Sequence, residues 1–284
     1  MSIIVRELRK IEEFRKCEKM PELVWGKGIG IIPVDLMCVY SNFGGVVLGA
    51  FDEKDKMIGF SIAFPGMLNG KTYLHSHMLG LLEEERLKGL GFKIKVKQRE
   101  VALRKGYDLV CWTFDPLQGV NANFNFRKLG VISNKYFRNF YGEMRDRINV
   151  GLESDRLFVE WWIRSRRVSD RMKGKYSDLK LSYLISEGAE IADETKLNDQ
   201  HLRFISSIRL DLRGDAVLVE IPSNIQKIKS LSMDLAADWR LKTRKLFENY
   251  LSKGYLVVDF ISEVKDGVRR NFYLLRKCRR EDVL

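Results

Sequence analysis

The stretch from Leu81 to Phe92 constrains the fold most, because it places a glycine-spaced turn between two regular segments. Arg86, Gly89 and Gly91 form an R-x-x-G-x-G pattern, preceded by an apolar run and followed by a segment (92–105) without Gly or Pro. A strand, a turn and a helix in this order direct the unpaired N–H groups of the first helical turn at an anion. Glycines let a phosphate approach the backbone closely. The pattern alone also fits an ordinary helix start, so its neighbours decide its meaning.

Composition bounds the size and the class of the protein. The 284 residues allow one large domain or two of ordinary size, and 45% hydrophobic residues are enough for a packed core. No apolar run approaches the roughly 20 residues that span a bilayer, and the N-terminus has no apolar signal region. The four cysteines are widely spaced and never form C-x-x-C. We therefore expect a reduced, cytoplasmic protein without structural zinc and without a membrane partner.

The formal net charge of +12 raises the alternative of a nucleic-acid-binding protein. Residues 1–150 carry 24 Lys and Arg against 17 Asp and Glu, and residues 151–284 carry 26 against 21, so the excess is spread evenly. The densest basic run, Arg164 to Lys175, has no interleaved aromatic residues that could stack on bases, and we expect a solvated linker there. A general positive field also favours an anionic cofactor or substrate, so nucleic acid is the less favoured interpretation.

Periodicity and turn residues predict a strand-rich first half with two long helices. The second helix has apolar residues on two sides, which predicts burial on both. The expected elements are a strand at 3–8, a helix at 9–20 closed by Pro21, a loop at 26–33, strands at 45–52 and 57–64, a turn at 65–70, a strand at 73–82, a helix up to residue 105, a strand at 107–113, a helix at 121–129 and a strand at 131–141. The order is β-α-(loop)-β-β-β-α-β-α-β.

This order and two motifs resemble the GNAT N-acyltransferases. The phosphate-binding signature of that family often reads V-x-P-E-x-R-G-x-G-I-G. The matching positions here are Leu81, Glu84, Arg86, Gly89, Leu90 and Gly91. The segment from Thr113 to Gly130, TFDPLQGVNANFNFRKLG, is similar to the family's N-x-x-A-x-x-x-Y-x-K-L-G-F helix. The resemblance implies an α/β (α+β) GNAT fold with a mixed central sheet, in which residues 1–145 form an acyl-CoA-binding domain.

Residues 146–284 are expected to form a second α+β domain packed on the first. Its predicted elements are strands at 154–162, 216–221, 255–262 and 271–276 and a helix at 231–251. The tripeptide Lys-Gly-Tyr ends the long helix of each half, at 105–107 and 253–255, so this half is either a degenerate GNAT-like repeat or a coincidental αβ unit. At that offset Asp234 and Trp239 replace Arg86 and Gly91, which implies that only the first half has a phosphate site. The whole layout resembles a group of two-part, uncharacterised GNAT acyltransferases.

The resemblance implies an acyl-CoA, most simply acetyl-CoA, as co-substrate and no metal. The main chain of Leu79 and Leu81 would pair with the pantetheine arm. The N–H of Leu81 would polarise the thioester carbonyl, an interaction worth roughly 3 kcal/mol in comparable sites. Arg86 and Lys88 would add positive charge, and Asn123 or Asn125 would contact CoA. The N–H groups expected at the pyrophosphate are those of Leu87, Lys88, Gly89, Leu90, Gly91 and Phe92.

Candidate catalytic residues are harder to identify. His77 is our first choice for a general base, although His75 and His77 also fit packed strand histidines, and no third ligand suggests a metal site. In the family, the usual acid is a Tyr four residues before the Gly of K-L-G, and Phe126 stands there. Tyr136 or Tyr141 would replace that acid, or the CoA thiolate would leave unassisted. Cys111 lies in a buried-type strand without a neighbouring His, and we interpret it as packing.

The predicted function is acyl-CoA-dependent N-acyl transfer, in particular N-acetyl transfer, to a small amine or amino acid by direct attack in a ternary complex. A non-catalytic acyl-CoA-binding sensor is the main alternative, because the helix Tyr is missing. A basic nucleic-acid-binding protein is a further alternative. The sequence leaves a homodimer open.

Overall fold

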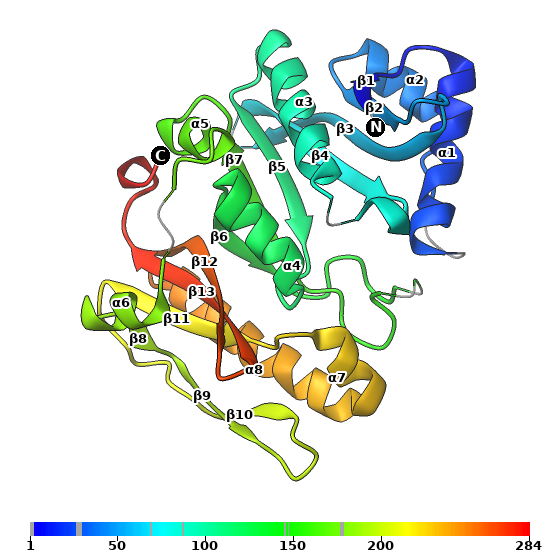
Figure 1. Ribbon diagram of the computed structural model, residues 1–284. Coiled ribbons are helices and arrows are strands. Elements are labelled where there is room, and N and C mark those ends of the chain that lie inside the picture. The colour runs from blue at the N-terminus through cyan, green and yellow to red at the C-terminus, as the bar shows by residue number, and fades with distance from the viewer. Residues whose placement is uncertain are drawn as a thin grey trace. The chain divides into compact units, whose positions relative to one another are not determined.

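The computed structural model describes residues 3–26, 30–68, 70–86, 88–144, 146, 148–176 and 179–284 (Figure 1). The chain divides into two compact units, Met1–Trp112 with Arg145–Ile148, and Thr113–Met144 with Asn149–Leu284. Both units combine helices and strands, which confirms the predicted α/β class. The domain boundary at residue 145 stays a prediction.

The sheet of the first unit has the strand order β1-β2-β3-β4-β5. Neighbouring strands are antiparallel except β4 and β5, which are parallel. The strands are β1 (Ile4–Glu7), β2 (Val46–Phe51), β3 (Met57–Leu68), β4 (Lys71–Leu81) and β5 (Leu109–Phe114). The last two residues of β5 belong to the second unit. The turn predicted at 65–70 is wrong in its start, since β3 continues through Pro65.

The helices of the first unit are α1 (Ile11–Trp25), α2 (Val34–Asn42), the 3₁₀ turn η1 (Glu83–Glu85) and α3 (Leu90–Arg104). Pro21 does not end α1 as expected but lies buried inside it. α2 is absent from the prediction, because only Met37 of this helix is buried and its sequence therefore lacks an amphipathic pattern. Residues 27–29 of the expected loop lie outside the described residues.

The sheet of the first unit is covered on both faces. On one face Lys95 of α3 donates to Ser76 of β4, at 3.0 Å. On the other face Tyr40 of α2 contacts the ring of Phe64 of β3, which pairs in register with His75 of β4. Successive residues of a strand point to opposite faces, so α2 and α3 lie on opposite sides of β4. The expectation that α3 is buried on two sides is wrong, since Val96 is 41% exposed.

In the second unit the strand order is β7-β6-β12-β13-β11-β8, and β9 and β10 pair in a separate two-stranded sheet. The strands are β6 (Ile132–Phe137), β7 (Arg156–Trp162), β8 (Glu190–Ile191), β9 (Asp193–Leu197), β10 (Arg203–Ile208), β11 (Ala216–Ile221), β12 (Tyr255–Lys265) and β13 (Val268–Lys277). The helices are α4 (Gly119–Ala122), the π-helical segment η2 (Asn123–Leu129), α5 (Arg166–Met172), α6 (Leu181–Ser186), α7 (Ile225–Leu231), α8 (Met233–Ser252) and the 3₁₀ turn η3 (Arg280–Asp282).

The basic run from Arg164 to Lys175 is not a solvated linker, as expected, but contains α5. Arg171 is 9% exposed and donates to Asp259 Oδ2 at 2.6 Å and to the carbonyl of Arg127 at 3.0 Å. A guanidinium can satisfy several acceptors at once while its stem packs against apolar groups. Local charge density therefore misled the prediction.

The second half contains a segment in which β11 is followed by α7, α8 and β12, but its strand pairing differs from that of the first half. β13 lies between β11 and β12 and pairs with both, whereas β4 pairs directly with β5. Asp234 lies in the first turn of α8, Ser232 caps that helix, and Trp239 is fully buried. The repeat stays a prediction.

Candidate functional site

β4 has a free edge where it separates from β5. The ladder between the two strands consists of two register pairs, Leu74 with Val110 and His75 with Cys111. β4 nevertheless continues to Leu81 and stays paired with β3 along its whole length. Both strands are fully described, so the edge of β4 that faces away from β3 has no ladder after His75. An unpaired strand edge is a template for an extended ligand.

The direction of the peptide groups shows what this edge offers. The N–H of Leu82 donates to the carbonyl of Ile58, on the β3 side, at 3.1 Å. Peptide groups alternate in direction along an antiparallel strand, so those of Leu79 and Leu81 point away from β3, to the free edge. The edge therefore carries two main-chain N–H groups and two carbonyls for which β3 supplies no partner.

The glycine turn leads from this edge into α3. Gly89 is the N-terminal cap of α3 and has a φ of 84°, a left-handed conformation that favours glycine. Its carbonyl accepts from the N–H groups of Phe92 and Lys93, at 3.1 and 3.2 Å. The first turn of α3, with Leu90 and Gly91, contains no acidic residue that would neutralise the positive end of the helix. The predicted site residue Leu87 lies outside the described residues.

The two cations of the turn have different surroundings. Arg86 is half-buried and donates to the carbonyl of Val24, at 2.8 Å, so it braces the end of α1. Lys88 is exposed, and its Nζ lies 3.6 Å from Glu85 Oε1. Lys88 is therefore the more available charge for an anion. The run Glu83–Glu85, just before the turn, adds negative charge that such an anion would have to tolerate.

His77 occupies a β-bulge in β4, which the sequence did not predict. Ile62 pairs with Met78 and the next residue, Ala63, pairs with Ser76, so His77 is the extra residue. The rings of His75 and His77 both contact Phe64, with centroids 5.2 and 5.8 Å away. Burial lowers the pKa of His77 and, with the positive charges of His77 and Lys95, lowers that of His75 to about 4. Bulges often re-aim side chains beside active sites.

A buried polar cluster lies on the opposite face of β4, at the point where the strands separate. Lys95 Nζ donates to Ser76 Oγ at 3.0 Å and to Gln98 Oε1 at 2.9 Å, and it lies 3.6 Å from the ring centroid of Trp112. Gln98 also donates to Ser61 Oγ, at 3.0 Å. Burial lowers the pKa of Lys95 to about 7. The sequence did not single out this lysine, because Lys93, Lys95 and Lys97 all alternate with apolar residues after Phe92.

Cys111 has a histidine beside it that sequence spacing could not reveal. The parallel register pairs Cys111 with His75, and paired residues point to the same face. Cys111 is fully buried. The expectation that no His lies near Cys111 held only along the sequence.

The predicted CoA contacts of the second unit, Asn123 and Asn125, lie in η2. Asn125 is 4% exposed and Asn123 is half-buried. Phe126, where the family has its Tyr, is fully buried and contacts the rings of Phe114 and Tyr273, with centroids 6.1 and 5.6 Å away. π-helical segments are rare and often occur at functional sites.

The two tyrosines suggested as acids also differ. Tyr136 donates to Asp155 Oδ2 at 2.6 Å, stacks on Phe247, and has its pKa raised well above the usual value, chiefly by burial. Tyr141 is 42% exposed, and its hydroxyl lies 3.2 Å from Thr113 Oγ1. Of the two, Tyr141 is the more exposed residue.

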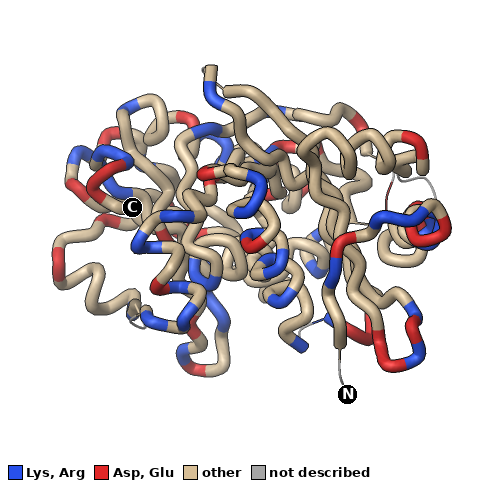
Figure 2. Tube along the Cα trace, turned by 90° about the horizontal axis from the view of Figure 1, so that it is seen from above, with Lys and Arg blue, Asp and Glu red and all other residues tan. Residues whose placement is uncertain are grey.

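The described residues contain neither a cluster of three or more His, Cys, Asp or Glu that could hold a metal ion, nor a helix long and apolar enough to cross a membrane. Basic and acidic residues are both spread over the trace of the described residues (Figure 2). The densest basic run, Arg164 to Lys175, contains α5, and its Arg171 is buried against Asp259.

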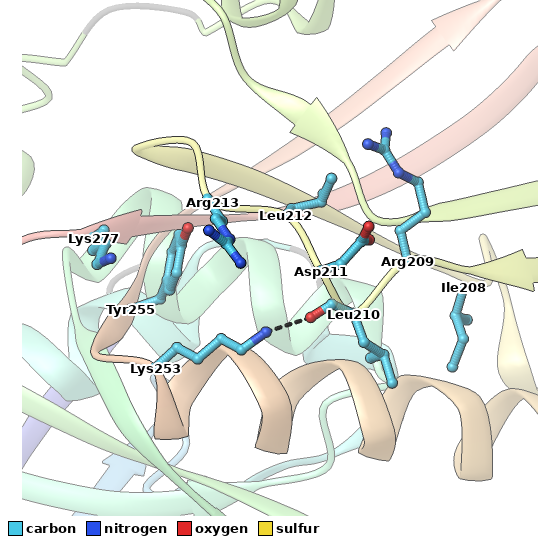
Figure 3. A pocket seen from close by; sticks show the side chains of 9 residues that line it. All are labelled: Ile208, Arg209, Leu210, Asp211, Leu212, Arg213, Lys253, Tyr255 and Lys277. Carbon is cyan, nitrogen blue, oxygen red and sulfur yellow. Dashed lines mark hydrogen bonds between the residues drawn. The ribbon is translucent and has the colours of Figure 1, made fainter.

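A pocket of about 760 Å³ lies in the second unit, at the loop between β10 and β11 (Figure 3). Arg209, Arg213, Lys253 and Lys277 line it. Arg209 pairs with Glu190 at 3.1 Å, and Lys253 donates to the carbonyl of Leu210. Burial, Asp215 and Glu190 raise the pKa of Tyr255, so acidic groups act on the pocket as well as basic ones. The lining nevertheless carries these four basic side chains against one acidic side chain, Asp211.

No family model and no curated protein matches the chain. Solved structures with a similar fold include the ribosomal-protein-S18-alanine N-acetyltransferase from Escherichia coli (11% identity, 58% of this chain and 96% of that chain covered, TM-score 0.45). A GNAT superfamily phosphinothricin acetyltransferase from Sinorhizobium meliloti, in complex with AcCoA, is 15% identical (56% and 88% covered, TM-score 0.46). An aminoglycoside 6'-acetyltransferase type Ii is 17% identical (57% and 99% covered, TM-score 0.45).

The fold assignment rests on the chain itself, because these identities and scores are low. Apart from α2, which was not expected, the first unit has the predicted order of strands and helices; it also has a parallel β4–β5 pair that opens after two register pairs and a glycine turn at the start of α3. The element order and the glycine turn agree with the resemblance drawn from the sequence, and the opening of the β4–β5 pair is an addition from the structure.

Proposed function

We propose that this protein is an acyl-CoA-dependent N-acyltransferase that transfers an acyl group, in the simplest case acetyl, to a primary amine. The observation that carries the proposal is the free edge of β4 at Leu79 and Leu81, which leads directly into the turn at Gly89. A pantetheine arm is extended and carries amide groups, so it can pair with such an edge as an added strand. Its pyrophosphate would then reach the N-terminal end of α3.

The reaction needs an unprotonated amine and a polarised thioester. The amine nitrogen attacks the carbonyl carbon, the C–S bond breaks, and CoA leaves as a thiolate that takes up a proton. In this proposal the N–H of Leu81 would hold the carbonyl oxygen, an interaction worth roughly 3 kcal/mol in comparable sites. We assign His77 as the base that removes the proton of the amine, because its lowered pKa keeps the imidazole neutral near pH 7.

The assignment of an acid to the thiolate is a separate proposal. The hydroxyl of Tyr136 is committed to Asp155, and Phe126 has no proton to give. Tyr141 is therefore our candidate, and unassisted departure of the thiolate is the alternative. Asn123 and Asn125 remain proposed contacts of CoA.

A second candidate function is an acyl-CoA-binding protein without turnover. The observation in its favour is Phe126, which fills the position of the usual acid and is fully packed between Phe114 and Tyr273. Such a protein would bind CoA at the same edge of β4 and release no thiol.

Calorimetry with CoA and acetyl-CoA, followed by a free-thiol assay with a set of amines, tests the proposal. We expect Lys88→Glu to weaken CoA binding about tenfold, since it reverses a charge beside the pyrophosphate. Lys105→Glu is the matched control, because Lys105 is exposed at the other end of α3, about 22 Å away and beyond the Debye length of about 8 Å.

Each outcome has one meaning. No CoA binding by the unmodified protein, or an equal loss in both variants, would refute the CoA site. CoA binding without thiol release from any amine would favour the binding protein over the enzyme.

A further inference from the structure

An aromatic surface surrounds the two histidines on the α2 side of β4. Its members are Tyr40 of α2, Phe64 of β3, and Tyr73, His75 and His77 of β4, and all five are half-buried. The ring centroids follow one another at 5.1 Å (Tyr40 to Phe64), 5.2 Å (Phe64 to His75) and 6.1 Å (His75 to Tyr73). Rings at such distances form one continuous apolar face.

The sheet register builds this surface. Phe64 is paired with His75, and Gly66 is paired with Tyr73. A Cβ at Gly66 would lie 2.7 Å from Cζ of Tyr73, so the glycine leaves room for the Tyr73 ring over β3. Residues 73 and 75 are two apart and share a face. The aromatic side chains are therefore placed together by the strands and not by chance surface packing.

None of the five residues that form this surface is acidic. In the described part of the chain, no ion pair or hydrogen bond joins His75 or His77 to an acidic side chain. The charges that shift the pKa of His75 are the positive ones of His77 and Lys95. A ligand with several ammonium groups would lose water here without gaining a partner.

We propose that the acceptor is a primary amine with an aromatic or extended apolar group next to the amine and no second positive charge. The proposal rests on the proposed function, because it places the acceptor beside His77. The aromatic group of the acceptor would pack on Phe64 and Tyr40, which brings the amine nitrogen to the imidazole of His77. A single ammonium tolerates aromatic faces through cation–π attraction before it is deprotonated.

The test compares 2-phenylethylamine, methylamine and spermidine as acceptors with acetyl-CoA, by thiol release and by mass of the acetylated product. We expect kcat/KM for 2-phenylethylamine to exceed that of either other amine at least about tenfold, because apolar contacts of this size discriminate by that factor. Phe64→Leu and Tyr40→Leu should each lower this preference, with the affinity for CoA unchanged. Phe43→Leu is the control, because Phe43 is 75% exposed outside the surface.

Failure of the inference and failure of the proposed function look different. If acetyl-CoA binds but spermidine is the better acceptor, or if Phe64→Leu lowers kcat/KM equally for 2-phenylethylamine and methylamine, the aromatic-acceptor inference is refuted and the enzyme stands. If acetyl-CoA binds and no amine releases thiol, the inference is refuted together with the enzyme. If acetyl-CoA does not bind at all, the CoA site itself is wrong.

Discussion

Lys95→Met tests whether burial lowers the pKa of Lys95, the lysine that lies where β4 and β5 separate. Lys95 is 3% exposed, and burial lowers its pKa from 10.5 to about 7. Between these pH values the unfolded chain holds a proton that the folded chain has lost, so the free energy of unfolding rises with pH. A full proton difference is worth about 1.36 kcal/mol per pH unit. Lys95 should therefore contribute about 2 kcal/mol of additional stability between pH 7.5 and 9.

The assay is urea-induced unfolding, followed by circular dichroism at pH 7.5 and pH 9. We use the difference between wild type and Lys95→Met, since other titrating groups then cancel. The loss of hydrogen bonds to Ser76 and Gln98 shifts this difference by a constant amount. Lys93→Met is the control, because Lys93 is exposed on the same helix. A difference between wild type and Lys95→Met that is the same at both pH values would refute the buried titrating lysine.

Two further predictions concern the chemistry. His77→Gln should lower kcat about 10²–10⁴-fold with unchanged acetyl-CoA affinity. In wild type, the acid limb of the pH profile of kcat/KM should lie below pH 6.5, because burial lowers the pKa of His77. A kcat within threefold of wild type would remove His77 from the mechanism. Cys111→Ala should leave kcat within about threefold of wild type, since the amine attacks the thioester directly. The intact mass of wild type should show no acyl-enzyme. An acyl group on Cys111 would instead establish a covalent step with His75 beside it.

The sequence predicted the elements that local patterns determine. The strands around residues 46–51, 57–64 and 71–81 and the helix after Gly91 are where alternation, turn residues and length placed them. The glycine turn was predicted correctly because the left-handed conformation at residue 89 favours glycine, and a glycine can be recognised in the sequence.

The features that the prediction missed depend on contacts between distant residues. The bulge at His77 exists only relative to the register of β3, and the approach of His75 to Cys111 only through the parallel ladder. The burial of Lys95 depends on acceptors 19 residues away on β4, such as Ser76. The buried Arg171 similarly needs Asp259, which is 88 residues away. From residue type and spacing alone, Lys95 and Arg171 would be expected to be solvated. His75 and Cys111 would be expected to lie apart.

The two faces and the free edge of β4 have different roles in the proposed reaction, so mutations can test these roles separately. Its side chains at His75 and His77 face α2 and the aromatic surface, its side chain at Ser76 faces Lys95, and its main chain at Leu79 and Leu81 forms the free edge. CoA affinity should then depend on the backbone of β4 and on the charge of Lys88, while acceptor choice depends on side chains of the α2 face. We therefore expect substitutions on the α2 face to change the preferred amine. The same substitutions should leave the affinity for CoA unchanged.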